Sequence, residues 1–161
     1  MGVSGSGKST VAEALAHSLG WPLAEGDDFH SPANIAKMHA GTPLDDADRM
    51  PWLHTIAAWI DARRQAGESA IVTCSALKRA YRDLLSGGRT ELLFVYLKGS
   101  AEVMSQHLAG RDGHFMPASL LASQFETLEE PTAGEPVLTV DAAHPVGEIV
   151  SEIEAGLRAA T

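Results

Sequence analysis

The chain has 161 residues, of which 45% are apolar and 20% are charged, and this composition predicts one globular domain with its own core. Its formal net charge of −9 at pH 7 argues against a nucleic-acid or anionic-membrane partner, because both bind clustered lysine and arginine side chains. The single cysteine, Cys74, excludes an intrachain disulfide and favours a reducing compartment such as the cytoplasm, and no apolar run has the roughly 18 residues that a membrane span needs.

The first ten residues, MGVSGSGKST, contain a phosphate-binding motif. Gly2–Ser9 fit the P-loop pattern G-x-x-x-x-G-K-[ST], in which backbone N–H groups surround a phosphate chain. The lysine of such a loop, here Lys8, reaches the β- and γ-phosphates, and the hydroxyl of Ser9 suits Mg²⁺. The residues expected to bind the nucleotide are consecutive: Gly2, Val3, Ser4, Gly5, Ser6, Gly7, Lys8, Ser9 and Thr10.

A P-loop normally follows a buried strand, yet only Met1 precedes this one. A central strand needs about five apolar residues, and without it the ladder groups of both neighbouring strands would be buried and unpaired. Two interpretations are open: the native chain begins upstream of Met1, or the fold tolerates the loss. We favour the first, so we expect the first strand to be truncated.

The spacing of apolar residues predicts helices and strands that alternate along the chain. We expect helices at 9–19, 32–40, 51–66, 78–85, 101–109, 117–128 and 146–159, and strands at 21–24, 70–74, 92–97 and 137–140. Near-continuous apolar strands alternating with helices are typical of a parallel sheet that is covered on both faces. Because no repeat, low-complexity tract or linker interrupts the pattern, we expect a single α/β domain over residues 1–161.

Other features narrow the class of P-loop protein. A GTPase would carry switch loops and an N-K-x-D base reader, and an oligomeric ATPase would carry an acid at the end of an apolar strand. The sequence contains no N-K-x-D string, and the candidate strand AIVTCSAL contains no acid. This favours small-molecule kinases, in which a carboxylate after the second strand can accept a proton or orient metal-bound water. Asp27 and Asp28 lie at that point, and a solvated turn is the alternative interpretation.

Longer strings resemble the thermoresistant gluconokinase family. They are GDDFHSPANIAKMHAGTPLDDADRMPWL (26–53), CSALKRAYRDLL (74–85), VYLKG (95–99), GHFMPASLLASQFETLEEP (113–131) and the P-loop itself. The resemblance runs along the whole chain and is specific, because P-loop kinases in general do not share these strings. Members of the family usually have a short strand before the P-loop, which agrees with the truncation that we favour.

The resemblance implies both a fold and an activity. The fold is the three-layer fold of the shikimate and nucleoside-monophosphate kinases, with a parallel sheet in the order 2-3-1-4-5, helices on both faces and a lid at about 110–131. The activity is transfer of the ATP γ-phosphoryl group to the 6-hydroxyl of D-gluconate, which gives 6-phospho-D-gluconate and ADP. Mg²⁺ is the expected cofactor, and the family's members are often homodimers.

The resemblance also implies roles for acidic and basic residues. It implies that Asp27 is the base that accepts the proton of the attacking hydroxyl, and that Asp28 is a less certain partner of Asp27 in this role. Gluconate is a polyol with one carboxylate, so its site should offer cations and polar groups. We expect Arg49 and Arg82 to face the substrate with Lys78 close by, since residues 78 and 82 would share one face of a helix. For each cation, a solvated surface charge is the alternative.

Three further side chains receive an interpretation from the sequence. Arg111 is the candidate lid arginine that closes on the phosphates, with an exposed loop charge as its alternative. His30 is expected to hydrogen-bond substrate hydroxyls, unless it has only a capping or packing role. Trp52, like Trp59 one heptad later, is expected to be a core or interface residue and not a stacking platform.

Three functions therefore need to be distinguished. The leading one is an ATP-dependent gluconate kinase. The second is a related P-loop kinase that acts on another sugar acid or on shikimate, and the third is a nucleotide-binding module without turnover.

Overall fold

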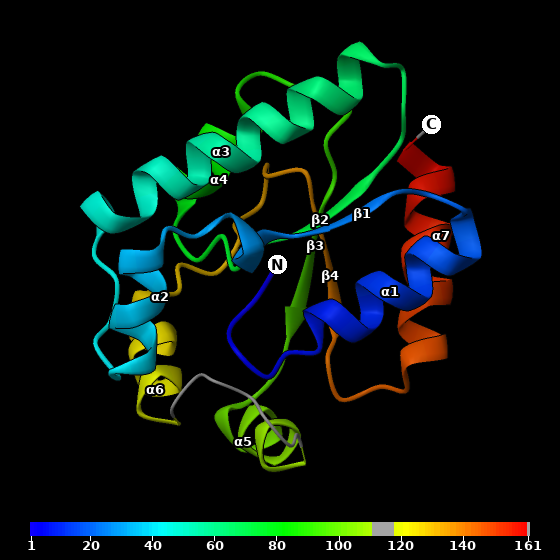
Figure 1. Cartoon of the computed structure of the whole chain (residues 1–161). Coiled ribbons are helices and arrows are strands. Elements are labelled where there is room, and N and C mark those ends of the chain that lie inside the picture. The colour runs from blue at the N-terminus through cyan, green and yellow to red at the C-terminus, as the bar shows by residue number, and fades with distance from the viewer. Residues whose placement is uncertain (111–117, 161) are drawn as a thin grey trace.

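A layer of parallel strands lies between two layers of helices in the computed structural model, which describes residues 1–110 and 118–160 (Figure 1). Strand β1 (Leu23–Glu25) pairs with β2 (Ile71–Thr73), and β3 (Phe94–Lys98) pairs with β4 (Val137–Asp141). Both pairs are parallel, as expected for strands that alternate with helices. No helix in the described ranges is long and apolar enough to cross a membrane.

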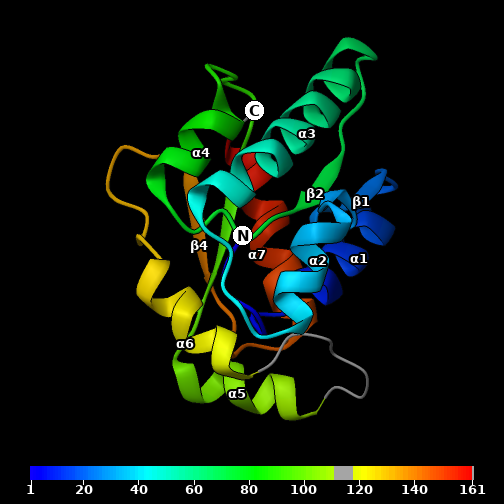
Figure 2. The ribbon, with the colours of Figure 1, turned by 60° about the vertical axis from the view of Figure 1, so that its left-hand side comes forward.

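The helices cover the strands on both faces (Figures 1 and 2). On one face, α1 (Lys8–Leu19) and α7 (Val146–Ala160) form a core that includes Leu15 and Ile153. On the other face, α3 (Asp46–Gln65) and α4 (Arg79–Ser86) form a second core that includes Ile56. The remaining elements lie around the carboxyl ends of the strands: the 3₁₀ helix η1 (Gly26–Phe29), α2 (Pro32–His39), α5 (Ala101–Ala109) and α6 (Ala118–Thr127).

In the described part of the chain, backbone hydrogen bonds of Met1 and Gly2 link the two strand pairs. The N–H of Gly2 donates to the carbonyl of Ser75, just beyond β2, over 3.2 Å, and the N–H of Leu97 in β3 donates to the carbonyl of Met1 over 3.0 Å. The Met1 ammonium donates in turn to the carbonyl of Val95. Residues 1 and 2 form no strand, but they lie between β2 and β3. The expected order 2-3-1-4-5 counts the truncated strand as strand 1, so β1 to β4 correspond to its strands 2 to 5. The pairs β1–β2 and β3–β4 agree with the neighbours 2-3 and 4-5 of that order, while the complete order stays a prediction.

Most helix boundaries follow from local signals that the sequence contains. Gly20 has a φ of 68° and ends α1, where its N–H donates to the carbonyl of Ala16. The side chain of Ser100 accepts from Val103 and begins α5. The predicted start of the long helix after Pro51 is wrong. Asp45 begins α3 in a reciprocal capping box, so the proline lies at the sixth helical position.

Candidate active site

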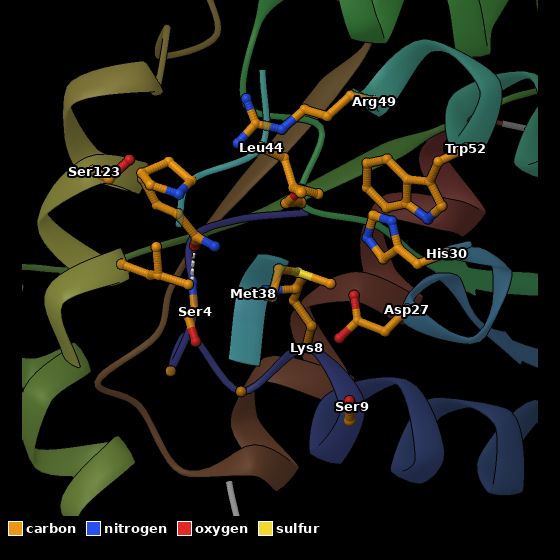
Figure 3. Close-up of a pocket in the computed structure, with 16 residues that line it drawn as sticks. Ser4, Lys8, Ser9, Asp27, His30, Met38, Leu44, Arg49, Trp52 and Ser123 are labelled. Carbon is orange, nitrogen blue, oxygen red and sulfur yellow. Dashed lines mark hydrogen bonds between the residues drawn. The ribbon is translucent and has the colours of Figure 1, made fainter. Parts of the chain in front are cut away.

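A cavity opens where the P-loop faces η1, α3 and α6 (Figure 3). Its position at the carboxyl ends of parallel strands is where open α/β sheets bind their ligands. The residues that line it are Ser4, Gly5, Gly7, Lys8, Ser9, Asp27, His30, Met38, Pro43, Leu44, Arg49, Trp52, Ser75, Leu120, Ser123 and Gln124.

The backbone of the P-loop is fixed by glycine conformation and by two distant side chains. Gly5 has a φ of 79°, and a Cβ atom there would lie 2.6 Å from the carbonyl oxygen of Met104. The N–H of Ser4 donates to Oε1 of Gln124 in α6 over 2.6 Å. Nδ1 of His107 in α5 donates to the carbonyl of Gly5 over 2.7 Å. Both helices on the two sides of residues 111–117 therefore hold the phosphate-binding loop.

The remaining P-loop residues divide into buried and cavity-lining positions. Gly2, Val3 and Ser6 are buried. Nζ of Lys8 donates hydrogen bonds to the carbonyl oxygens of Gly2 and Val3, each over 2.9 Å. Lys8 and Ser9 begin α1 and line the cavity, so both lie at the helix N-terminus that suits a phosphate chain. Thr10 is exposed and is not among the lining residues.

Glu25 is a candidate that the sequence reasoning missed. Its Oε2 accepts hydrogen bonds from Oγ of Ser9 at 3.0 Å and from Oγ1 of Thr73 at 2.7 Å. Its Oε1 is buried and has no partner among the described residues, which is unusual for a carboxylate oxygen. A signal was present, because Glu25 directly follows the expected strand 21–24 and lies two residues before Asp27. The pairing with Thr73 is 48 residues away in the sequence, and local reasoning could not supply it.

Asp27 reaches the cavity because the chain turns sharply after β1. Gly26 allows this turn, since a Cβ atom there would lie 2.0 Å from the carbonyl oxygen of Thr73. Nε1 of Trp52 also donates to the carbonyl of Gly26 over 2.7 Å and fixes the start of η1. Figure 3 shows the Asp27 carboxylate directed into the cavity on the side of Lys8. Asp28 is exposed and does not line the cavity.

His30 lies next to Asp27 in a packed aromatic contact. Its ring stacks on Trp52 with the centroids 4.2 Å apart and the planes at 14°. Trp52 is buried, as expected of a core residue, and its ring also lines the cavity. Burial lowers the pKa of His30, with Asp27 acting to raise it and Arg49 to lower it. The neutral ring lies 3.3 Å from the amide nitrogen of Asn34, which donates to Nδ1 and leaves Nε2–H as a donor.

Arg49 is the buried cation on the far side of the cavity from Lys8 (Figure 3). Its Nη1 lies 3.4 Å from the hydroxyl of Tyr81, and its guanidinium carbon is 5.8 Å from the centre of that ring. The Tyr81 hydroxyl donates to Asp46, which also binds Nζ of Lys78 at 3.0 Å. Lys78 is therefore near Arg49 through Tyr81, but it is not among the residues that line the cavity.

Arg82 does not face the cavity, contrary to the expectation from its spacing. Its side chain is 2% exposed and forms a double contact with Glu135, with Nε to Oε2 at 2.6 Å and Nη2 to Oε1 at 3.2 Å. The argument from spacing was wrong because Lys78 is the N-cap of α4, with φ −99° and ψ 151°. The two side chains therefore share no helical face. Arg111 lies outside the described residues, so its role in the lid stays a prediction.

The fold and the cavity together define a P-loop kinase. A family model described as an AAA domain matches residues 1–131, and the chain belongs to that family. The shikimate kinase of Aquifex aeolicus shares the fold, with a TM-score of 0.66 at 19% identity over 98% of this chain and 94% of the other.

Within this class, the chain belongs to the gluconokinase family. It is 51% identical to a gluconokinase of Gluconobacter oxydans over 90% of this chain and 82% of the relative. It is 47% identical to the thermoresistant gluconokinase of Escherichia coli over 96% of this chain and 89% of the relative. The crystal structure of a gluconokinase from Sinorhizobium meliloti superposes with a TM-score of 0.89 at 50% identity, over 99% of this chain and 89% of that one.

Proposed function

We propose that the chain transfers the γ-phosphoryl group of ATP to the 6-hydroxyl of D-gluconate, which gives 6-phospho-D-gluconate and ADP. One observation carries the proposal: the P-loop lysine and a carboxylate that can act as a base line the same cavity as a buried arginine. The names of the relatives support the choice of gluconate as the substrate. Shikimate or another sugar acid is the alternative substrate.

The reaction needs positioning and charge neutralisation more than covalent help. The P-loop N–H groups and the N-terminus of α1 bind the phosphates, and Lys8 balances the charge of the group in transfer. Asp27 accepts the proton of the 6-hydroxyl as its oxygen bonds to the γ-phosphorus. The bond from that phosphorus to the bridging oxygen breaks, and its electron pair leaves with ADP.

Two residues fit a divalent cation beside the phosphates. Ser9 offers a hydroxyl oxygen, and Glu25 adds a buried carboxylate oxygen that has no partner among the described residues. Oxygen donors of this kind suit Mg²⁺, which keeps several of its waters when it is bound beside phosphates. When bound, the ion would neutralise charge on the β- and γ-phosphates. Glu25 orients the Ser9 hydroxyl through the hydrogen bond to Oε2, and its charge would help to hold a divalent ion there.

The opposite side of the cavity suits a sugar acid. Arg49 is the buried cation there, and a guanidinium binds a carboxylate through two parallel hydrogen bonds. His30 offers Nε2–H to a hydroxyl of the polyol chain. Gluconate would then extend from Arg49 toward Asp27, with its carboxylate and its 6-hydroxyl at opposite ends. A cytoplasmic location and a homodimeric state belong to the same proposal.

A panel of substrates tests this proposal. ADP release is measured with ATP and Mg²⁺ in the presence of gluconate, other sugar acids or shikimate, and the position of the phosphate in the product is read by phosphorus NMR. We expect the highest kcat/KM with gluconate and a phosphate on its 6-oxygen. A preference for shikimate or another sugar acid would assign the related activity, and ATP binding without ADP release on any substrate would leave a nucleotide-binding module.

A further inference from the structure

Two neighbouring side chains in the active-site cavity are of types that can accept a proton. Asp27 carries a carboxylate and His30 an imidazole, and Figure 3 shows both directed into the cavity. A neutral imidazole accepts a proton only at the ring nitrogen that carries no hydrogen. The contacts of the two ring nitrogens therefore decide whether His30 can compete with Asp27 as a base.

Asn34 lies next to His30 but does not line the cavity. Its backbone N–H donates to Oγ of Ser31, the N-cap of α2, over 3.1 Å, which fixes Asn34 in the first turn of that helix. The side chain is buried, and its Nδ2 donates to the carbonyl oxygen of Asp48 in α3 over 2.9 Å. Because a backbone carbonyl can only accept hydrogen bonds, this contact determines which end of the Asn34 amide is the nitrogen.

The same amide nitrogen also contacts the ring of His30, with Nδ2 of Asn34 3.3 Å from Nδ1 of the imidazole. An amide NH₂ group has two hydrogens to donate and accepts none, so Nδ1 must be the acceptor and the ring proton must be on Nε2. In the part of the chain that the structure describes, Nε2 has no hydrogen-bond partner. His30 therefore presents an N–H donor to the cavity, while its one basic nitrogen is occupied by Asn34.

The surroundings of His30 favour this neutral form of the ring. The ring is held in place by its stacking on Trp52, and a second proton at Nδ1 would be directed against the NH₂ group of Asn34. Burial lowers the pKa of His30, while the nearby charges act in opposite directions, Asp27 to raise the pKa and Arg49 to lower it. Hydrogen bonding and burial therefore act together against the imidazolium.

We propose that Asn34 is a positioning residue, which acts through His30 to hold the imidazole as a hydrogen-bond donor and so leaves the role of base to Asp27. The hydroxyl that accepts from Nε2–H keeps its own proton and is held without being activated. Only the hydroxyl beside Asp27 loses its proton to the protein. That these hydroxyls belong to gluconate rests on the proposed function, whereas the position of the ring proton does not.

Nitrogen NMR of the wild-type chain with isotope-labelled histidine tests the position of this proton without nucleotide or gluconate. The signals of His30 are assigned by their absence from the spectrum of His30→Gln. We expect Nδ1 to have the chemical shift of an unprotonated nitrogen and Nε2 that of a protonated one at neutral pH. A proton on Nδ1, or an equal mixture of the two tautomers, would overturn the proposal.

Asn34→Asp should reverse the ring, because a carboxylate accepts from Nδ1–H where the amide donated. The same NMR experiment should then show the proton on Nδ1 and a raised pKa of His30. With an acceptor in place of a donor in the cavity, the KM of gluconate should rise about ten-fold at neutral pH. As the pH falls and the ring gains its second proton, Nε2–H returns, so the KM of this variant should recover while that of the wild type changes little.

The matched control is Ala33→Asp, which adds the same charge at an exposed position of α2 and should leave both the tautomer and the KM of gluconate as in the wild type. A raised KM in Asn34→Asp with no recovery at lower pH would indicate a merely structural role for Asn34 and contradict the proposal. If the wild-type chain does not phosphorylate gluconate, the proposed function fails, and the NMR result alone decides the role of Asn34.

Discussion

The part of the cavity proposed to bind the nucleotide and the part proposed to bind the sugar acid are built in different ways. The nucleotide half is made of consecutive residues, and its shape depends on backbone conformation at positions such as Gly5. The sugar-acid half is made of single side chains, Asp27, His30 and Arg49, which come from different elements. A local motif is therefore sufficient to recognise the first half, whereas the second half exists only when η1, α2 and α3 have packed together. The following variants test whether the halves have these separate tasks.

The largest effect is expected in the nucleotide half. Lys8→Met removes the charge placed against the transferring phosphoryl group, so kcat should fall by about 10³-fold. Steady-state kinetics with gluconate measures this, and Lys98→Met, at an exposed ion pair with Glu130, is the matched control. A variant with near-normal kcat would remove Lys8 from the catalytic role.

Asp27→Asn should lower kcat by about 10²–10³-fold, because an amide cannot accept the proton of the attacking hydroxyl. The Kd of ATP, measured by calorimetry, should be unchanged if this residue belongs to the sugar-acid half. The control is Asp28→Asn, whose side chain is exposed and outside the cavity. If ATP affinity falls as much as kcat, Asp27 belongs to the metal and nucleotide half instead.

Arg49→Ala should raise the KM of gluconate by about 10–100-fold, because a charge-assisted contact to the substrate carboxylate is lost. The KM of ATP should change little. The comparison is made with gluconate and with the neutral polyol sorbitol, which lacks the carboxylate. A similar loss for both would indicate that Arg49 acts on the shape of the cavity and not on the carboxylate.

Glu25→Gln should weaken Mg²⁺ binding by about ten-fold, because the variant keeps the size of the side chain but loses the charge beside Ser9. The measurement is the affinity of Mn²⁺ for the complex with ADP, followed by electron paramagnetic resonance, which does not require turnover. The Kd of metal-free ADP serves as the control and should be unaffected. An unchanged Mn²⁺ affinity would limit Glu25 to a structural role with Thr73.

The smallest effect on catalysis is expected for Arg82, although its effect on stability is large. Arg82→Met removes the double contact from the buried Glu135 carboxylate, which keeps the 3.5 Å contact with Arg79 and a hydrogen bond from Thr132. The variant should destabilise the fold by at most about 3–5 kcal/mol in urea unfolding, with the KM of gluconate unchanged. The double variant with Glu135→Met should regain much of that stability. If Arg82→Met instead raises the KM of gluconate in folded protein, the original expectation of a substrate contact is correct.

The ion pair with Arg82 also predicts an acid limit for the fold. Hydrogen bonding to Arg82 lowers the pKa of Glu135 from 4.5 to about 2. A carboxylate with a lowered pKa stabilises the native state above pH 4.5, and this contribution is lost as the pH falls toward 2. The wild-type chain should therefore lose more stability over that interval than the double variant does.

The sequence was most informative where structure is determined by neighbouring residues. The P-loop, the strand segments and the ends of α1 and α5 could be predicted because glycines, caps and apolar runs are local signals. Asp45 was also a local signal, but the general preference of proline for the first turn was given more weight, and the predicted start of α3 was five residues late.

The rest of the site depends on contacts that no local pattern contains. Arg82 was expected to face the substrate with Lys78 close by, because both residues were placed on one helix. In the structure neither side chain lines the cavity, and Lys78 is the N-cap of α4. Arg82 meets Glu135 across 53 residues, and Glu25 meets Thr73 across 48. Both pairings arise from the order in which strands and helices assemble, which composition and spacing leave undetermined.

One helix touches both halves of the cavity. Through Gln124, α6 holds the backbone of the phosphate loop, and through Leu120 it packs against Met38 and Leu44, which line the cavity that is proposed to hold the sugar acid. A shift of α6 on filling one half must change the free energy of filling the other, and thermodynamic linkage makes that influence equal in both directions. The binding of either substrate would then change the affinity for the other substrate by the same factor. The order in which the two substrates bind would therefore be determined by their rates of binding alone.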